Sequence, residues 1–162
     1  MLTLGRLFTG VLAVGMCLSS CQDDDETSID TQTLLFGSFY GECSGERCVE
    51  IYKLDTNKRE LSEDTQDKYP LANSPYNGQY TALPASFYPL VQDLPNLIPN
   101  QLFLEANGSI GSPDASDQGG FYLEVTQNGN RRYWFIDTQK TRIPAFLHPL
   151  VDTLSTRIPK LP

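Results

Sequence analysis

Residues 121–138 read Phe-Tyr-Leu-Glu-Val-Thr-Gln-Asn-Gly-Asn-Arg-Arg-Tyr-Trp-Phe-Ile-Asp-Thr, and this stretch decides the fold. Its centre, Asn128-Gly129, is a preferred pair for a two-residue type I′ hairpin turn, because both residues tolerate the positive φ that this turn requires. Runs rich in aromatic and branched residues flank the turn on both sides. The stretch therefore predicts an antiparallel hairpin in which Gln127 pairs with Asn130.

Counting outward from the turn assigns the hairpin residues to two faces, and places Leu123 opposite Trp134. One face is apolar and carries Phe121, Leu123, Val125, Trp134 and Ile136. The other is a candidate binding face and carries Tyr122, Glu124, Tyr133 and Phe135, beside Arg131. An aromatic sheet face left uncovered would form an interaction surface. The alternative is that a loop, in the region 69–80, covers it.

Further strands are predicted in the first half of the chain. Residues 33–40 and 48–54 are rich in aromatic and branched residues, and the loop 44–47 joins them as a second hairpin. Residues 59–63 add a short third strand. Residues 106–120 are rich in Gly, Ser and Asp, which predicts a loop before the hairpin described above.

Two segments, 83–98 and 143–161, are apolar at helical spacing but are interrupted by prolines. Pro84 suits the first turn of a helix. Pro89 must kink or restart it, because proline has no N–H to donate. We therefore expect two Pro-kinked helices.

The same two segments match each other without gaps at an offset of 60 residues. Residues 83–91 align with 143–151, and further matches are Leu94 with Leu154, Ile98 with Ile158, and Pro99 with Pro159. Because proline is costly inside helices, its recurrence indicates an internal duplication, (ββα)2, with units of about 33–105 and 106–162. The alternative is that two amphipathic helices converged independently.

Together these elements predict one α+β domain over residues 33–162, a mixed antiparallel sheet with both Pro-kinked helices on one face. The apolar face of the hairpin would meet helix residues Leu90, Val91, Leu94, Leu150, Val151 and Leu154.

Composition excludes several classes of protein. The chain has 162 residues, 40% of them hydrophobic, and a formal net charge of −8. It is thus neither a disordered polar tail nor a multi-pass membrane protein. A nucleic-acid binder is also excluded, because the charge has the wrong sign for phosphate contacts.

The N-terminus predicts export and lipidation. Arg6 precedes an apolar run over residues 7–18, which is too short to span a bilayer. Leu18-Ser19-Ser20-Cys21 then resembles the bacterial lipobox, which implies that residues 1–20 are a signal peptide and that Cys21 is lipidated. The alternative is an ordinary secretory signal with a chance cysteine.

Residues 21–32 are predicted to form a solvated tether. The acidic run 22–26 cannot pack against a core. It also resembles the export signal that follows the lipidated cysteine in surface lipoproteins of Bacteroidota. The alternative is a plain flexible spacer. A lipid-anchored protein lies on a membrane without spanning it.

Cys43 and Cys48 are predicted to form a structural disulfide, because the exported chain folds in an oxidising compartment. Redox catalysis is disfavoured, since that chemistry uses Cys-x-x-Cys at a helix N-terminus. Free or exchange-active thiols are the remaining alternative. A zinc site is also disfavoured, because the chain has only one histidine, His148.

No other motif predicts a cofactor, a metal or a catalytic residue. The chain has no Gly-x-Ser-x-Gly, Walker or dinucleotide-binding motif. Residues 114–120 contain carboxylates and glycines as calcium loops do, but Val125 stands where a bidentate Glu is required. A turn that leads into the strand at Phe121 is the preferred interpretation.

Four short stretches resemble a family of small, uncharacterised surface lipoproteins of Bacteroidota: residues 40–43 and 48–54 around the cysteine pair, and residues 112–120 and 133–138 around Asp117-Gln118-Gly119-Gly120 and Tyr133-Trp134. In that family a second cysteine pair stands where this chain has Ser112 and Ala115. The resemblance implies that cysteine chemistry there is dispensable. It implies a location and no activity.

These observations lead to an expected function. The protein is expected to be an outer-membrane lipoprotein, exposed on the cell surface, that binds a protein or glycan through its aromatic sheet face without being an enzyme. One alternative is an envelope accessory protein or inhibitor that faces the periplasm. A small hydrolase or thiol-redox enzyme is a further one.

Overall fold

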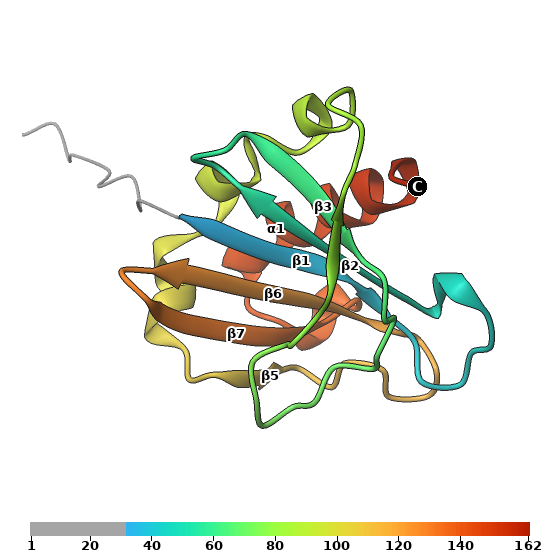
Figure 1. The fold of residues 1–162 in the computed structure, drawn as a ribbon. Coiled ribbons are helices and arrows are strands. Elements are labelled where there is room, and N and C mark those ends of the chain that lie inside the picture. The colour runs from blue at the N-terminus through green and yellow to red at the C-terminus, as the bar shows by residue number, and fades with distance from the viewer. Residues whose placement is uncertain (1–31) are drawn as a thin grey trace, which may run out of the picture.

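The computed structural model describes residues 32–162, so the predicted signal peptide, Cys21 and most of the tether lie outside the described residues. The described part is a mixed α/β fold in which one seven-stranded sheet is covered on both faces (Figure 1). The strands are β1 (Thr33–Phe39), β2 (Val49–Asp55), β3 (Glu60–Asp64), β4 (Tyr80–Ala82), β5 (Gly108–Ile110), β6 (Gly120–Gln127) and β7 (Asn130–Asp137), and the α-helix of this part is α1 (His148–Arg157).

The strand order is β4-β3-β2-β1-β6-β7-β5. Neighbouring strands are antiparallel except β5 and β7, which are parallel. The predicted register of the β6–β7 hairpin is confirmed, with Gln127 opposite Asn130 and Leu123 opposite Trp134. The predicted strands near 33–40, 48–54 and 59–63 are also confirmed, as β1, β2 and β3.

One face of the sheet packs against α1 and a series of short 3₁₀ turns, behind the sheet in Figure 1. The apolar hairpin residues predicted for this face are all in this core. Of the residues expected to meet them, Val91, Leu94, Leu150, Val151 and Leu154 do so, whereas Leu90 is 40% exposed.

The segment 83–98 is not an α-helix, so the prediction of two Pro-kinked helices is wrong for this segment. It forms the 3₁₀ turns Tyr88–Leu90 and Leu94–Leu97, followed by Asn100–Leu104. Pro84, Pro89, Pro95 and Pro99 remove N–H donors every few residues, which no continuous α-helix tolerates. Pro149 lies in the first turn of α1, where a backbone N–H would have no acceptor within the helix. Its lack of an N–H therefore removes no helical hydrogen bond.

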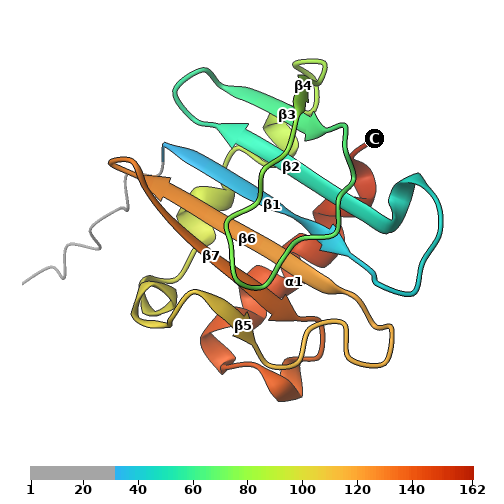
Figure 2. The same ribbon diagram turned by 60° about the horizontal axis from the view of Figure 1, so that its bottom comes forward.

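The second face of the sheet is covered as well. Figure 2 shows the segment between β3 and β4, residues 65–79, crossing in front of the sheet on the side opposite α1. The residues of the candidate binding face are buried beneath or beside it, with exposed fractions of 0% for Tyr122, 1% for Glu124, 3% for Phe135 and 8% for Tyr133. The interpretation of an open aromatic face is therefore wrong, and its alternative, a covering loop, is confirmed. The physical reason is that leaving this apolar area in water would cost about 25 cal/mol per Å².

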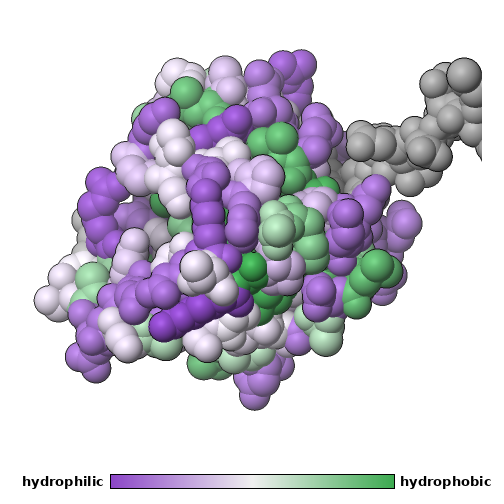
Figure 3. Space-filling view, turned by 180° about the vertical axis from the view of Figure 1, so that it is seen from behind, coloured by the Kyte–Doolittle hydropathy of each residue, from purple (hydrophilic) through white to green (hydrophobic). Residues whose placement is uncertain are grey.

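The outer surface of the helical layer is mixed in character (Figure 3). Hydrophilic side chains dominate it and separate smaller apolar spots. Leu97 and Leu104, in the 3₁₀ turns, are exposed by 39% and 87%. No helix among residues 32–162 is long and apolar enough to cross a bilayer.

Candidate functional site

Three carboxylates fasten the covering segment to the sheet, and the first is Asp64 at the end of β3. Asp64 is 2% exposed and its oxygens accept three hydrogen bonds from residues of the segment. The Tyr76 hydroxyl donates to Oδ2 at 2.6 Å, the backbone N–H of Asp67 donates to Oδ2 at 3.1 Å, and that of Gln79 donates to Oδ1 at 2.5 Å. A buried carboxylate is stable when donors saturate it in this way.

The second carboxylate is Glu124, in the middle of β6. The Tyr122 hydroxyl donates to Oε2 at 2.5 Å, and the N–H of Tyr76 donates to the same oxygen at 3.1 Å. Nε of Arg131 donates to Oε1 at 2.5 Å, and a second guanidinium nitrogen of Arg131 donates to the carbonyl of Tyr76 at 2.6 Å. Glu124 and Arg131 thus form a charge-neutral pair. Glu124 binds the N–H of Tyr76 and Arg131 binds its carbonyl oxygen, so the pair fixes the backbone of Tyr76 at two points.

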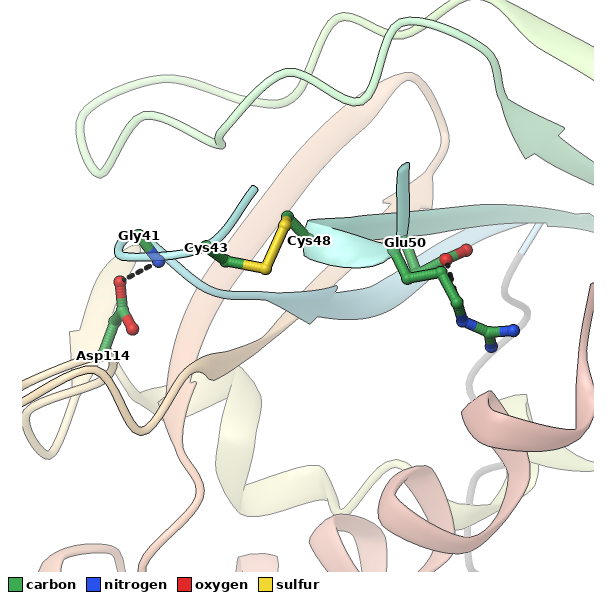
Figure 4. The surroundings of a disulfide bond; sticks show 6 residues. Gly41, Cys43, Cys48, Glu50 and Asp114 are labelled. Carbon is green, nitrogen blue, oxygen red and sulfur yellow. Dashed lines mark hydrogen bonds and ion pairs between the residues drawn. A yellow bond between two sulfur atoms is a disulfide. The ribbon is translucent and has the colours of Figure 1, made fainter. Parts of the chain in front are cut away.

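The third carboxylate is Asp114, in the turn before β6. Its oxygens accept from the Tyr69 hydroxyl at 2.8 Å and from the N–H of Gly119 at 2.9 Å. They also accept from the N–H of Gly41 at 2.7 Å (Figure 4). Gly119 has φ +70°, a conformation that glycine adopts without strain. The preferred interpretation of residues 114–120 as a turn is therefore confirmed. No cluster of three or more His, Cys, Asp or Glu side chains in the described part is arranged to hold a metal ion.

The pKa of Tyr69 reports on the hydrogen bond between Tyr69 and Asp114. Burial, the hydrogen bond to Asp114 and the charge of that carboxylate raise the pKa of Tyr69 from 10.0 to about 12. Because the pKa in the folded state is the higher one, the stabilisation by the neutral phenol is complete below pH 10 and is lost as the pH rises through about 12. In the Asp114→Asn variant the pKa of Tyr69 should fall from about 12 towards 10.

The measurement is the tyrosinate absorbance during alkaline titration, taken as the difference between each protein and its Tyr69→Phe counterpart. An unchanged midpoint in Asp114→Asn would show that Asp114 does not hold the segment.

The predicted disulfide between Cys43 and Cys48 is present, with an S–S distance of 2.05 Å and a Cα–Cα distance of 5.6 Å (Figure 4). It closes the loop between β1 and β2, close to Gly41 and Asp114. Closing so short a loop contributes roughly 2 kcal/mol on the chain-entropy model. Neither cysteine is therefore a free thiol in this structure.

A pocket of about 250 Å³ opens between the covering segment and the sheet. Strands β1, β2, β4, β6 and β7 and the end of the covering segment line it, through Thr33, Leu35, Lys53, Tyr76, Asn77, Gly78, Tyr80, Glu124, Thr126 and Arg131. This volume lies just below the usual range of small-molecule sites.

The sheet register explains how these groups meet. Leu35 of β1 is paired with Lys53 on one side and with Glu124 on the other, so all three point to the same face. The next row on this face carries Thr33, paired with Asp55 of β2 on one side and with Thr126 of β6 on the other. Asp55 forms an ion pair with Lys58. Leu35 therefore forms an apolar floor with a cation at one side, a carboxylate at the other, and two hydroxyls at one end.

In the described part of the chain, one cation of this pocket lacks an ion-pair partner and one hydroxyl lacks a hydrogen-bond partner. The ion pairs found among residues 32–162 do not include Lys53, whose ammonium lies 5.1 Å from the centre of the Tyr80 ring. The buried hydroxyl of Tyr80 has no hydrogen-bond partner in the described structure. Burial raises the pKa of Tyr80, and the charges of Asp64 and Glu124 raise it further, so this hydroxyl stays protonated and is a donor without an acceptor.

The pocket includes only one residue of the candidate binding face, Glu124. Tyr122, Tyr133 and Phe135 belong instead to the apolar cluster under the covering segment. The sequence reasoning missed Lys53, although its position offered a signal. Every second residue of β2 points to the face that packs against this cluster, as Val49 and Ile51 do. Lys53 is the next residue in that series, and a lysine is unusual on a buried face. His148 takes no part, since its Nε2 lies 2.9 Å from the carbonyl oxygen of Lys140.

Comparison of the chain with models of protein families, with curated proteins and with solved structures found no match.

Proposed function

We propose that this protein is a lipid-anchored binding module of the bacterial outer membrane, exposed on the cell surface, and that it binds a small polar ligand in the pocket beneath Asn77 and Gly78. The proposal of location is supported by the lipobox-like end of the signal at Cys21 and by the acidic residues that follow it. The proposal of binding is carried by one observation: the pocket holds a lysine without a carboxylate partner in the described part of the chain.

The buried aromatic residues argue for a small ligand over a protein partner at this face. Tyr122 and Phe135 are 0% and 3% exposed, so they offer no area to a docking surface. A pocket with an apolar floor and several hydroxyl, amide and charged groups is typical of sites for small polar molecules, including single units of a glycan.

Binding in the pocket is tested with a variant that fills it. Thr126→Tyr places a ring in the pocket at a half-buried strand position, where tyrosine is well tolerated. Thr81→Tyr is the matched control, because Thr81 is an exposed strand residue that does not line the pocket. Wild type and control should be stabilised by the same members of a library of sugars, sugar acids and amino acids, by about 2.7 kcal/mol at ligand concentrations about 100 times Kd.

The measurement is the melting temperature of each protein with each compound. Thr126→Tyr should melt at the same temperature with and without ligand. If it is stabilised as the wild type is, or if no compound stabilises the wild type, the proposed site is wrong.

Location is tested separately on intact cells. Trypsin added outside the cells should degrade the wild-type protein, and the Cys21→Ser variant should lose both labelled palmitate and its place in the membrane fraction. A wild-type protein that resists trypsin until the cells are opened would contradict surface exposure.

We also propose that the two segments aligned at an offset of 60 residues arose by duplication. Three aligned pairs are buried in the same core: Val91 and Val151, Leu94 and Leu154, and Ile98 and Ile158. The aligned prolines make the same turn, since the carbonyl of Pro84 accepts from the N–H of Phe87 at 3.0 Å and that of Pro144 accepts from Leu147 at 3.0 Å. These shared contacts support common descent over chance similarity.

A further inference from the structure

The charges that line the pocket indicate which class of ligand it takes. Three charged residues line it: Lys53, Glu124 and Arg131. Glu124 and Arg131 neutralise each other at 2.5 Å, and Arg131 also donates to the backbone of Tyr76. Lys53 therefore carries the one charge that no other lining residue neutralises, while the buried carboxylate of Asp64 lies behind Gly78 and is held by the donors of the covering segment.

Resting on the proposed binding function, we infer that the pocket takes a small monoanion, a sugar-sized carboxylate with several hydroxyl groups, whose carboxylate pairs with Lys53. Lys53 is half-buried, and the ring of Tyr80 lies against its ammonium at 5.1 Å. A lysine held in this way is already partly desolvated and partly ordered, which lowers the cost of pairing it with an incoming anion.

A single negative charge fits the pocket better than a double one. Lys53 and Glu124 flank Leu35 on neighbouring strands, which places their backbones about 10 Å apart across the floor. The single negative charge of a ligand carboxylate is balanced by the single positive charge of Lys53. A dianionic phosphate would keep one uncompensated charge, because Arg131 is already paired with Glu124, and that charge would be repelled by Glu124.

The remaining lining groups explain the hydroxyls of the ligand. Thr33, Thr126 and Asn77 supply groups that both donate and accept hydrogen bonds, and the Tyr80 hydroxyl supplies a donor that lacks an acceptor among the described residues. A ring with hydroxyls around its edge can pair with several of them, while its carbon skeleton lies on Leu35.

The test is calorimetric titration of the full-length lipoprotein in detergent with three probes: glucuronate, glucose and glucose 6-phosphate. Wild type should bind glucuronate about tenfold more tightly than either other probe. Lys53→Met should lose about tenfold in affinity for glucuronate, and Lys53→Arg should restore most of it. Lys58→Met is the matched control and should bind as wild type does, because Lys58 pairs with Asp55 outside the pocket.

The outcomes separate this inference from the proposed function. Glucose binding as tightly as glucuronate, or Lys53→Met keeping full affinity for glucuronate, would overturn the monoanion while leaving the pocket as the binding site. Tighter binding of glucose 6-phosphate would show that the pocket selects dianions. If none of the three probes binds, the inference fails, and the library screen with Thr126→Tyr then decides whether the proposed function fails with it.

Discussion

Gly37→Ala is expected to destabilise the protein by about 4 kcal/mol or more, an exceptionally large effect for the addition of one methyl group. Gly37 lies in the middle of β1, the strand between β2 and β6. A Cβ atom at this position would overlap the carbonyl oxygen of Glu50 and lie 2.8 Å from Cδ1 of Ile51. The oxygen belongs to the backbone of β2, so the clash is relieved only if the two strands move apart. Because native proteins are stable by only about 5–15 kcal/mol in general, such a loss would remove a large part of the stability.

The measurement is urea unfolding of wild type and variant. Ser38→Ala is the control, since Ser38 is the next residue of β1, is 8% exposed, and points to the other face of the sheet. It should cost about 1 kcal/mol or less. A midpoint of Gly37→Ala close to that of Ser38→Ala would mean that β1 and β2 are not packed as closely as described.

Glu124→Ala is expected to cost about 2–3 kcal/mol, because the buried Tyr122 hydroxyl loses its acceptor, whereas the 36% exposed side chain of Arg131 is hydrated once its partner is gone. Glu124 is 1% exposed and accepts from Arg131, the Tyr122 hydroxyl and the N–H of Tyr76. Without it, the hydroxyl and the N–H lose an acceptor beneath the covering segment. The segment should then detach locally, so amide hydrogens near Tyr76 should exchange faster than those of β1.

Thermal unfolding and hydrogen exchange measure these two effects together. Glu42→Ala is the matched control, because Glu42 is exposed and outside the network, and it should change the stability by about 0.5 kcal/mol or less. Normal protection at Tyr76 in Glu124→Ala would contradict the role of Glu124 as a fastening point.

The local part of the fold was predictable because its causes are local. Asn128-Gly129 determines a turn, and the turn determines the register of β6 and β7 without reference to the rest of the chain. The disulfide was also predictable, from two cysteines close in sequence in a chain whose N-terminus predicts export. The place of β1 between β2 and β6, and the parallel pairing of β5 with β7, depend on contacts between distant segments and have no local pattern.

Two features of the sequence explain where the structure differs from the expected helix and the expected open face. The helical spacing in 83–98 was real, since Val91 and Leu94 are buried, but four prolines prevent the hydrogen bonds of an α-helix. Leu34-Leu35-Phe36 places apolar side chains on both faces of β1, which is typical of a sheet covered twice. That run predicts the buried state of Tyr122 more directly than the composition of β6 does.

The candidate site was predictable only in part for a related reason. The sequence places Glu124 beside aromatic residues on one strand, whereas the pocket forms where Lys53, Tyr80 and Asn77 come together from separate segments. The pairing of Lys53 with Leu35, and of Leu35 with Glu124, exists only once the strand order is known.

The edges of the sheet have a consequence under the proposed lipid anchoring. Both edge strands, β4 and β5, have only three residues, whereas the central strands β1, β2, β6 and β7 have seven or eight. Lipid anchoring confines molecules to two dimensions, where they collide often and in similar orientations. Long free edges would join under such crowding into continuous sheets that run from one molecule to the next. Edges this short offer few hydrogen bonds to a neighbour, so a dense layer of this protein should remain a layer of separate molecules.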